Sequence, residues 1–425
     1  MATMILVEKP AVAELATTSA NIQNTRAMDQ AKLAAKTELI SMATAIDNAA
    51  AAGSNGVTYK FSRNISKLEG VYREAAMEII NADIAAAEYS VKETAKGLEI
   101  TWGEEAEEGG DEPSEPADEE PAIESPEDLG NLIEEHDEIE VTLNNDMAFT
   151  APITIAEGKK ATIHLNDIIE NNTGSYKDEQ NKTIWNPVFD VDGGELVIDG
   201  EGEVTGAGLA IRVSNGGSAT INGGTFTSTS AGQTIAALGE GSVVTINDAT
   251  VNAQEAAVMA FDGGELVLNG GDYNTIDNFV VGTNGTVGRG GNTIHLKNVT
   301  LNGNITSNGY IACGIYAANN DTIIVDEGTE INVTNGCGIC QRGGNVIVKA
   351  GAKITTTADE NFIPGGVGDK KKNLNADGII FDEEANYPGH TGMSLVVEEG
   401  AIFDVAGENV KIYPLEGVEP NVIIA

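Results

Sequence analysis

Three side chains near the C-terminal end of the sequence could together cleave a polysaccharide: Asp377, Asp382 and His390. Hydrolysis of a glycosidic bond uses two carboxyl groups roughly 5–10 Å apart across the substrate. A lyase would instead use a base, with calcium or basic residues that stabilise an acidic sugar. The competing interpretation, which the sequence favours, is that Asp377-Gly378 is a turn between strands and that His390 lies in a loop.

The cysteines could serve redox chemistry or bind a metal, because Cys337-Gly338-Ile339-Cys340 is a Cys-x-x-Cys motif. The motif lies in an expected strand, where residues three apart face opposite ways. Cys313-Gly314-Ile315-Tyr316 is a similar phrase one period earlier, so Cys313 and Cys337 are expected to stack. We therefore predict packing for these thiols, with a disulfide or a metal as the alternatives.

Other chemistry has less support in the sequence. Acidic residues such as Asp190, Asp199 and Asp262 recur with the turns, which indicates solvated positions. Histidines are few and scattered, and no calcium-binding nonapeptide repeat occurs. The sequence therefore predicts neither a metal site nor a cofactor. Aromatic side chains that could stack on sugars are sparse; the candidates are Tyr176, Trp185, Tyr273, Tyr310 and Tyr316.

A repeat over residues 192–357 must position these side chains. A glycine turn followed by alternating apolar residues returns as Asp192-Gly193-Gly194-Glu195-Leu196, and again from Asn215, Asp262 and Arg342. Equivalent apolar residues stand about 22 to 29 positions apart: Ile198, Ile221, Ile246, Leu268, Leu296, Val325 and Val348. Two further strand-like runs follow each first one. Three strands per period without a helical pattern predict a solenoid.

Phrases such as Ala219-Thr220-Ile221-Asn222-Gly223-Gly224-Thr225-Phe226 resemble the pectate-lyase-like superfamily. The resemblance covers roughly residues 138–425 and implies a right-handed parallel β-helix. That superfamily contains lyases, glycosidases, phage tailspikes and inert surface proteins, so the resemblance indicates the fold better than the function.

The same C-terminal residues also resemble a motif of polygalacturonase-type glycosidases. Asn375-Ala376-Asp377-Gly378 is similar to the Asn-Thr-Asp-Gly phrase of that family, and Gly389-His390 to its Gly-His-Gly. In the family the second acidic motif and the histidine lie on successive coils, about one period apart, whereas here Asp382, Glu383 and Glu384 are crowded between Asp377 and His390 within about 13 residues. The family's Arg-x-Lys motif is also missing here.

Residues 1–102 are expected to form a separate helical or α+β module. The periodicity predicts helix within residues 10–52, then a helix from about Ser66 followed by a hairpin that ends at Trp102. This arrangement resembles small N-terminal modules of phage virion proteins. The resemblance implies that the module anchors the chain to a particle, with these residues at the contact: Leu68, Tyr72, Ile79 and Trp102.

We predict that residues 103–130 form an acidic, proline-containing linker. A segment of this composition buries too little apolar surface to offset the conformational entropy that it would lose on folding. Residues 131–425 then form the predicted β-helix. Residues 365–372 hold the basic cluster of that domain. Its glycines and lysines do not follow the residue order of a phosphate-binding loop, so we predict a surface loop.

The formal net charge of −42 argues against binding nucleic acid, whose phosphates it would repel. The first residues lack the pattern of a secretory signal, and no run has the length of a membrane span. We therefore expect synthesis in the host cytoplasm, and the resemblance to phage virion proteins implies a place on a virion surface. The sequence shows no clear heptad run, although a homo-oligomer, trimer or dimer, is expected from the resemblance to phage fibres.

These observations predict a non-enzymatic phage protein, either a head fibre, a capsid-decoration protein or a tail fibre. Its β-helix would be displayed outward and would bind host or mucosal glycans. The alternatives are a tailspike-like polysaccharide depolymerase and a bacterial surface adhesin.

Overall fold

The computed structural model describes residues 56–60, 73, 77, 80, 90–94, 97–101, 123–178, 181, 183–230, 232–284, 290–306, 311–359, 366–367, 372–373, 376–384 and 392–425. The chain divides into two compact units, Met1–Glu119 and Glu120–Ala425. Each unit is described by itself.

The described part of the first unit is a small antiparallel sheet. Its strands are β1 (Gly56–Lys60), β2 (Ser90–Thr94) and β3 (Gly97–Thr101), with β3 in the centre. Ile80, Leu98 and Ile100 are buried. The predicted hairpin is confirmed as β2 and β3, whereas the sequence pattern does not reveal β1.

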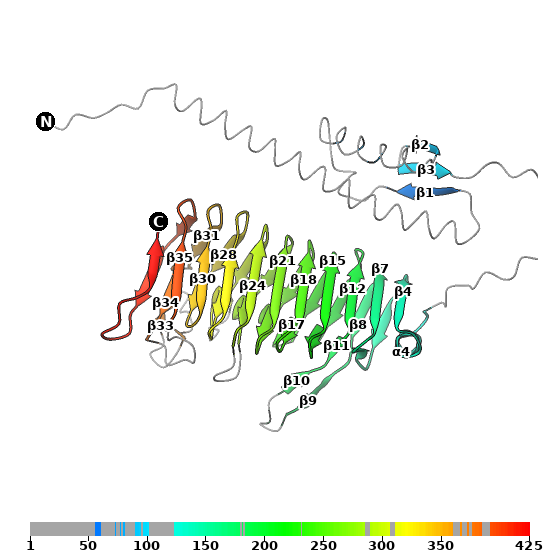
Figure 1. Cartoon of the computed structure of the whole chain (residues 1–425), viewed down its shortest axis with the longest axis horizontal. Coiled ribbons are helices and arrows are strands. Elements are labelled where there is room, and N and C mark those ends of the chain that lie inside the picture. The colour runs from blue at the N-terminus through cyan, green and yellow to red at the C-terminus, as the bar shows by residue number, and fades with distance from the viewer. Residues whose placement is uncertain are drawn as a thin grey trace, which may run out of the picture. The chain divides into compact units, whose positions relative to one another are not determined.

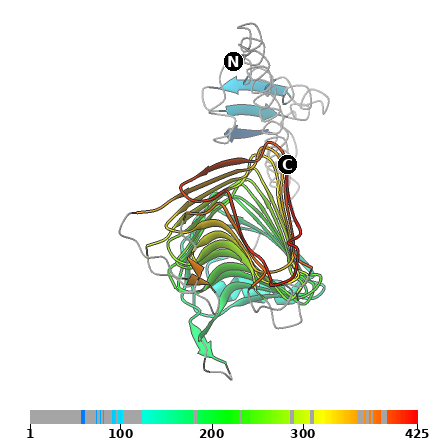
Figure 2. The same ribbon diagram turned by 90° about the vertical axis from the view of Figure 1, so that its left-hand side faces the viewer.

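The second unit consists mainly of three long parallel sheets, each of which receives one strand from every successive coil (Figures 1 and 2). The first sheet has eleven strands: β4 (Glu138–Leu143), β7 (Lys160–Leu165), β12 (Glu195–Asp199), β15 (Ser218–Asn222), β18 (Val243–Asn247), β21 (Glu265–Asn269), β24 (Thr293–Lys297), β27 (Thr322–Val325), β30 (Asn345–Val348), β35 (Ser394–Val397) and β38 (Val422–Ile424).

The second sheet has ten strands: β5 (Met147–Phe149), β8 (Ile168–Asn171), β13 (Glu203–Gly206), β16 (Thr225–Ser228), β19 (Thr250–Ala253), β22 (Asp272–Thr275), β25 (Thr300–Asn304), β28 (Glu330–Thr334), β31 (Lys353–Thr357) and β36 (Ile402–Val405). The third sheet also has ten: β6 (Ile153–Ala156), β11 (Pro187–Asp192), β14 (Leu209–Ser214), β17 (Gln233–Leu238), β20 (Ala256–Phe261), β23 (Phe279–Thr283), β26 (Cys313–Ala317), β29 (Cys337–Gln341), β34 (Ile379–Asp382) and β37 (Val410–Tyr413).

Equivalent residues of successive coils pair in register, which confirms the predicted repeat. Ile198 pairs with Ile221, and Ile221 with Ile246. These side chains are fully or almost fully buried, while their neighbours along each strand face outward. Gly193 and Gly263 open two of the connecting turns with φ of 81° and 97°, a conformation that favours glycine. The second unit is therefore a mainly β solenoid with a continuous apolar core.

The first end of the solenoid is covered by helix α4 (Pro126–Glu135). The Ser125 hydroxyl accepts a hydrogen bond from the backbone N–H of Asp128, so Ser125 caps the helix, and Pro126 suits its first turn. Leu129 and Ile133 are buried in the main core. The prediction of a linker as far as residue 130 is therefore wrong at its end, because residues 126–130 belong to this amphipathic helix.

Two short strand pairs interrupt the coils. β9 (Ser175–Lys177) and β10 (Thr183–Trp185) form an antiparallel hairpin that projects from the solenoid (Figures 1 and 2). β32 (Gly366–Val367) and β33 (Lys372–Asn373) form a second antiparallel pair within the predicted basic loop.

Candidate functional site

The third sheet carries the predicted acidic residues in its last coils. Asp377 is buried just before β34, where its Oδ1 accepts a hydrogen bond of 2.9 Å from the backbone N–H of Glu408. Its Oδ2 lies 3.5 Å from Lys411 Nζ on β37. Burial lowers the pKa of Lys411, but the charge and hydrogen bond of Asp377, together with the nearby Tyr413 and Glu408, outweigh this effect, so the pKa is raised overall. Asp377 therefore holds a salt bridge between two coils.

Asp382 is buried at the other end of β34. Its Oδ2 lies 3.9 Å from Arg342 Nε, and Arg342 Nη1 donates a hydrogen bond of 3.4 Å to the Tyr316 hydroxyl. Asp377 lies at the turn before β34, whereas Asp382 is the last residue of that strand. Each carboxylate also contacts a different cation. This geometry does not favour their catalytic role, which stays a prediction, and His390 and Asn375 lie outside the described residues.

The turn interpretation of Asp377-Gly378 agrees with the local backbone. Ala376 has φ of 59°, and a Cβ on Gly378 would lie 2.5 Å from the carbonyl oxygen of Asn409. Only glycine fits where one coil passes so close to the next. Asp377 is thus held at a turn that leads into β34.

The three cysteines lie together on the outer side of the third sheet. Cys313 pairs with Cys337 in register, and all three thiols belong to one buried cluster. This confirms the predicted stacking of Cys313 and Cys337. The prediction that Cys337 and Cys340 face opposite ways is wrong, since both belong to that outer cluster while Ile339 lies in the main core.

Gly338 explains this arrangement. A Cβ on Gly338 would lie 2.3 Å from Ile354 Cγ2, so this position also faces the core. Two successive residues, Gly338 and Ile339, therefore face inward, and the usual alternation is broken between the two cysteines. Burial raises the pKa of Cys313 and of Cys337, and a hydrogen bond with Cys337, together with burial, raises that of Cys340. The thiols remain protonated, which suits packing better than redox chemistry.

Two aromatic candidates lie inside the protein. Tyr273 is fully buried at an inward position of β22, and its hydroxyl donates a hydrogen bond of 3.3 Å to the carbonyl of Gly270. Tyr316 is 3% exposed and stacks on Phe279, with ring centroids 5.4 Å apart. Neither ring is accessible to a sugar, so the prediction that Tyr273 and Tyr316 could stack on one is wrong.

The remaining aromatic candidates lie on the projecting hairpin. Tyr176 on β9 is 52% exposed, and Trp185 on β10 is half-buried. Ile184 pairs with Tyr176 and Trp185 with Ser175, so the two rings face opposite sides of the hairpin. Tyr310 lies outside the described residues. So do the four predicted anchoring side chains: Leu68, Tyr72, Ile79 and Trp102.

Asparagine ladders connect the outer surfaces of successive coils, a feature that the sequence analysis missed. On the second sheet each asparagine donates a side-chain hydrogen bond to its equivalent in the preceding coil, with distances of 2.9 to 3.2 Å: Asn274 to Asn252, Asn302 to Asn274 and Asn332 to Asn302. A similar ladder at the end of the first sheet joins Asn222, Asn247 and Asn269. The regular spacing of asparagines in the repeat could have revealed both.

Charged side chains also join coils. Asp326 contacts His295 Nε2 through one carboxylate oxygen, and its other oxygen lies 2.5 Å from Lys349 Nζ. The three residues come from β24 and from the ends of β27 and β30, so the group spans three coils. Burial raises the pKa of Asp326, but the hydrogen bonds with Lys349 and His295 and the charges of these two side chains together outweigh this effect, and the pKa is lowered overall.

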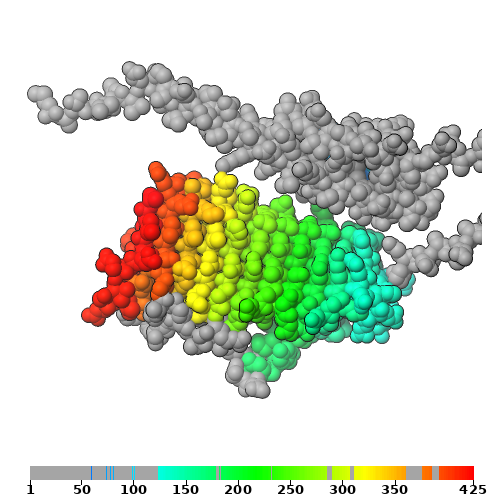
Figure 3. Space-filling view, in the orientation of Figure 1, coloured from blue at the N-terminus to red at the C-terminus, as the bar shows by residue number. Residues whose placement is uncertain are grey.

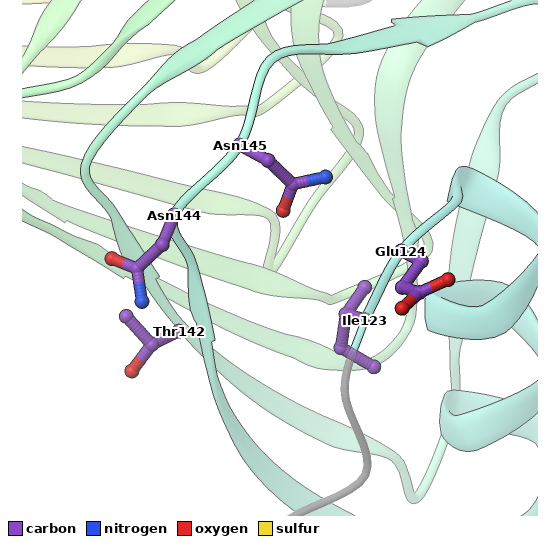
Figure 4. Close-up of a pocket in the computed structure, with 5 residues that line it drawn as sticks. All are labelled: Ile123, Glu124, Thr142, Asn144 and Asn145. Atoms are coloured by element: carbon purple, nitrogen blue, oxygen red, sulfur yellow. The ribbon is translucent and has the colours of Figure 1, made fainter.

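An open depression lies beside α4, lined by Ile123, Glu124, Thr142, Asn144 and Asn145 (Figure 4). Ile123 and Glu124 come from the segment that leads into α4, and the other three from β4 and the turn after it. Glu124, Asn144 and Asn145 are exposed. None of the predicted catalytic or stacking residues lines this depression.

Within the described ranges, no group of three or more His, Cys, Asp or Glu side chains could hold a metal ion. None of the helices described is long and apolar enough to cross a membrane. Comparison with protein-family models, curated proteins and solved structures found no match to this chain.

Proposed function

We propose that this chain is a structural protein of a phage surface, a head fibre, capsid-decoration protein or tail fibre. Residues 1–102 would attach it to a capsid or other virion protein, and the acidic segment that follows would serve as a tether. The solenoid, of the right-handed sense expected from the resemblance, would be displayed outward. Host or mucosal glycans are its proposed ligands.

The observation that supports this proposal best is the use of the outer polar side chains. The asparagine ladders, the Asp326 group and the Asp377–Lys411 salt bridge all join one coil to the next. Such contacts stiffen a rod, because in a solenoid each coil is held only by its neighbours. The division into two units also suits an anchor and a displayed rod.

A polysaccharide depolymerase is the second candidate. Asp382 and Glu383 are both buried at the end of β34, and Glu383 Oε2 has no hydrogen-bond partner among the described residues. This candidate predicts loss of activity on Glu383→Gln.

An activity assay on polysaccharides of the host envelope distinguishes the two. The structural proposal predicts binding without release of reducing ends or of unsaturated sugars, which absorb in the ultraviolet. Release of either product by the full chain, abolished by Glu383→Gln but not by Glu399→Gln, would replace it with the depolymerase. Recovery of the protein on bacterial envelopes rather than on particles would favour an adhesin.

A further inference from the structure

The outer face of the first sheet carries a row of mainly β-branched side chains. The middle outward residue of each strand pairs with its equivalent in the next coil, as Thr220 does with Thr245 and Ile324 with Ile347. Every member is partly exposed. From β7 to β35 the row consists of Thr162, Val197, Thr220, Thr245, Val267, His295, Ile324, Ile347 and Val396. Figure 3 shows the coils that bear this row following one another along the solenoid.

The corresponding rows of the other two sheets differ in character. On the second sheet the row is polar, with threonines at both ends of the asparagine ladder, from Thr205 to Thr355. On the third sheet Met259 and Tyr316 belong to the buried outer cluster. Among the described coils, therefore, the first sheet is the one whose middle outward row is both aliphatic and partly open to solvent. A long apolar stripe of this kind marks a contact surface.

We propose that this face binds the same face of a second copy of the chain, in an antiparallel two-fold dimer. A two-fold axis along β21 lays the row of one copy on the row of the other. Val267 then meets its own equivalent, β12 lies over β30 and β7 over β35. All nine members of the row are covered, because Val267 is its middle member. Both copies use the same surface, so the assembly closes at two.

The charged side chains that flank the row match in this arrangement. The axis brings Asp199 opposite Lys349 of the second copy, and Glu398 opposite His164. Opposite charges that face each other across a contact fix its register. Glu265 is the one carboxylate of the described face that meets its own equivalent.

The other two-fold arrangement is disfavoured by charge. An axis along the solenoid would lay the two copies parallel, with the first outward position of each strand over the last. Glu195 would then face Asp199, and Lys160 would face His164. No opposite charges would meet, and facing like charges destabilise a contact. The antiparallel dimer is therefore the arrangement that the side chains support.

The area of the face is close to that of a stable interface. Nine strands spaced about 4.8 Å apart, each with five residues of about 3.3 Å, cover roughly 40 by 17 Å. This is about 650 Å² before the relief of the side chains is counted, and stable interfaces bury approximately 800 Å² per partner. The dimer is therefore expected at micromolar concentrations.

The net charge of −42 does not exclude this contact, since the face is far less acidic than the whole chain. The described positions from β7 to β35 carry three lysines and five carboxylates: Lys160, Lys297, Lys349, Glu195, Asp199, Glu265, Asp326 and Glu398. Repulsion between charges elsewhere on the two copies is screened at about 0.15 M salt, where the Debye length is about 8 Å.

Sedimentation equilibrium of the full chain at that salt concentration tests the proposal, from about 1 to 300 µM. We expect a shift from the 44.2-kDa monomer to twice that mass as concentration rises. Thr220→Lys should weaken the dimer about tenfold or more, because the ammonium group loses water against Ile324 of the second copy. Thr205→Lys, the same change at the equivalent row of the second sheet, should leave the dimer unaltered.

Glu265 provides a test of opposite sign. Glu265→Gln removes the one repulsion between equivalent carboxylates, so it should strengthen the dimer roughly twofold to fivefold. Glu203→Gln, on the outer face of the second sheet, is the matched control and should have no effect. Both changes are nearly isosteric and lie at the surface, so neither depends on a variant that fails to fold.

Cross-linking locates the axis. A short bis-maleimide should join two copies of Val267→Cys but not two copies of Thr205→Cys, because only the former residue faces its equivalent. A monomer at all concentrations would overturn the proposal and leave the virion role untouched. A trimer would also overturn it, as would a dimer that Thr220→Lys leaves intact or that Glu265→Gln weakens.

Discussion

Arg212 on β14 binds Asp190 on β11 through two hydrogen bonds. Arg212 Nε donates to Asp190 Oδ1 at 2.8 Å, and Nη2 donates to Oδ2 at 2.6 Å. The two residues pair in register on neighbouring strands of the third sheet. A planar guanidinium and a carboxylate match in this geometry, which makes the pair stronger than a single hydrogen bond. It joins one coil to the next on a partly buried surface.

Replacing Arg212 by alanine should destabilise the protein by about 2 kcal/mol, because the partly buried Asp190 carboxylate loses both donors. Arg212→Lys should recover only part of the loss, since lysine keeps the charge but not the paired geometry. Urea unfolding followed by circular dichroism measures both. The exposed Lys297→Ala serves as control, with a change under about 0.5 kcal/mol. Equal effects of Arg212→Ala and Lys297→Ala on the free energy of unfolding would show that the Arg212–Asp190 pair does not stabilise the protein.

The asparagine ladder should be most sensitive in its middle. Asn274 donates to Asn252 and accepts from Asn302, so Asn274→Ala removes two hydrogen bonds, at a cost of about 1–2 kcal/mol. Asn304, exposed at the end of β25, provides the matched control. Thermal unfolding should show a lower midpoint for Asn274→Ala than for Asn304→Ala. Identical midpoints would mean that the ladder does not stabilise the coils.

Asp326 should make stability depend on pH in the acid range. Its pKa in the folded protein is lowered below the value of about 3.9 for an unfolded chain. The stabilisation is therefore fully present above about pH 5, and it is lost as the pH falls through the folded pKa. Unfolding free energies of wild type and Asp326→Asn should differ at neutral pH and converge in acid. Asp404→Asn, at an exposed position, is the control. A difference in unfolding free energy between wild type and Asp326→Asn that widens in acid would contradict the prediction.

The cysteines should resist modification while the protein is folded. All three thiols are buried, and burial contributes to the raised pKa of each. A thiol reagent at neutral pH should label none of them in the native protein and all three after unfolding in denaturant. Rapid labelling of any thiol in the native state would contradict the buried cluster.

The repeat could be predicted because two local signals coincide in it. Gly193 and Gly263 mark turns, and the residues that follow, such as Leu196 and Ile198, alternate with period two. Each coil also repeats the signal of the previous one, which fixes the register of the sheets. The apolar core follows from this pattern alone.

The candidate site could be predicted only in part, because its details depend on contacts between coils. Tyr273 occupies an inward position whose space is set by the neighbouring coils, so its burial does not show in its own sequence. Cys337 and Cys340 share a side because Gly338 has no room for a side chain beside Ile354. Nor does the spacing of Asp377 and Asp382 reveal that Lys411 and Arg342 contact them.

Immunogold electron microscopy of purified particles from the source culture, combined with mass spectrometry, tests the central claim most directly. We predict label on intact particles, together with peptides from both residues 1–102 and residues 123–425. Label on capsids would indicate a head fibre or decoration protein, and label at the tail would indicate a tail fibre. Particles that carry neither label nor peptides would contradict the proposed virion role.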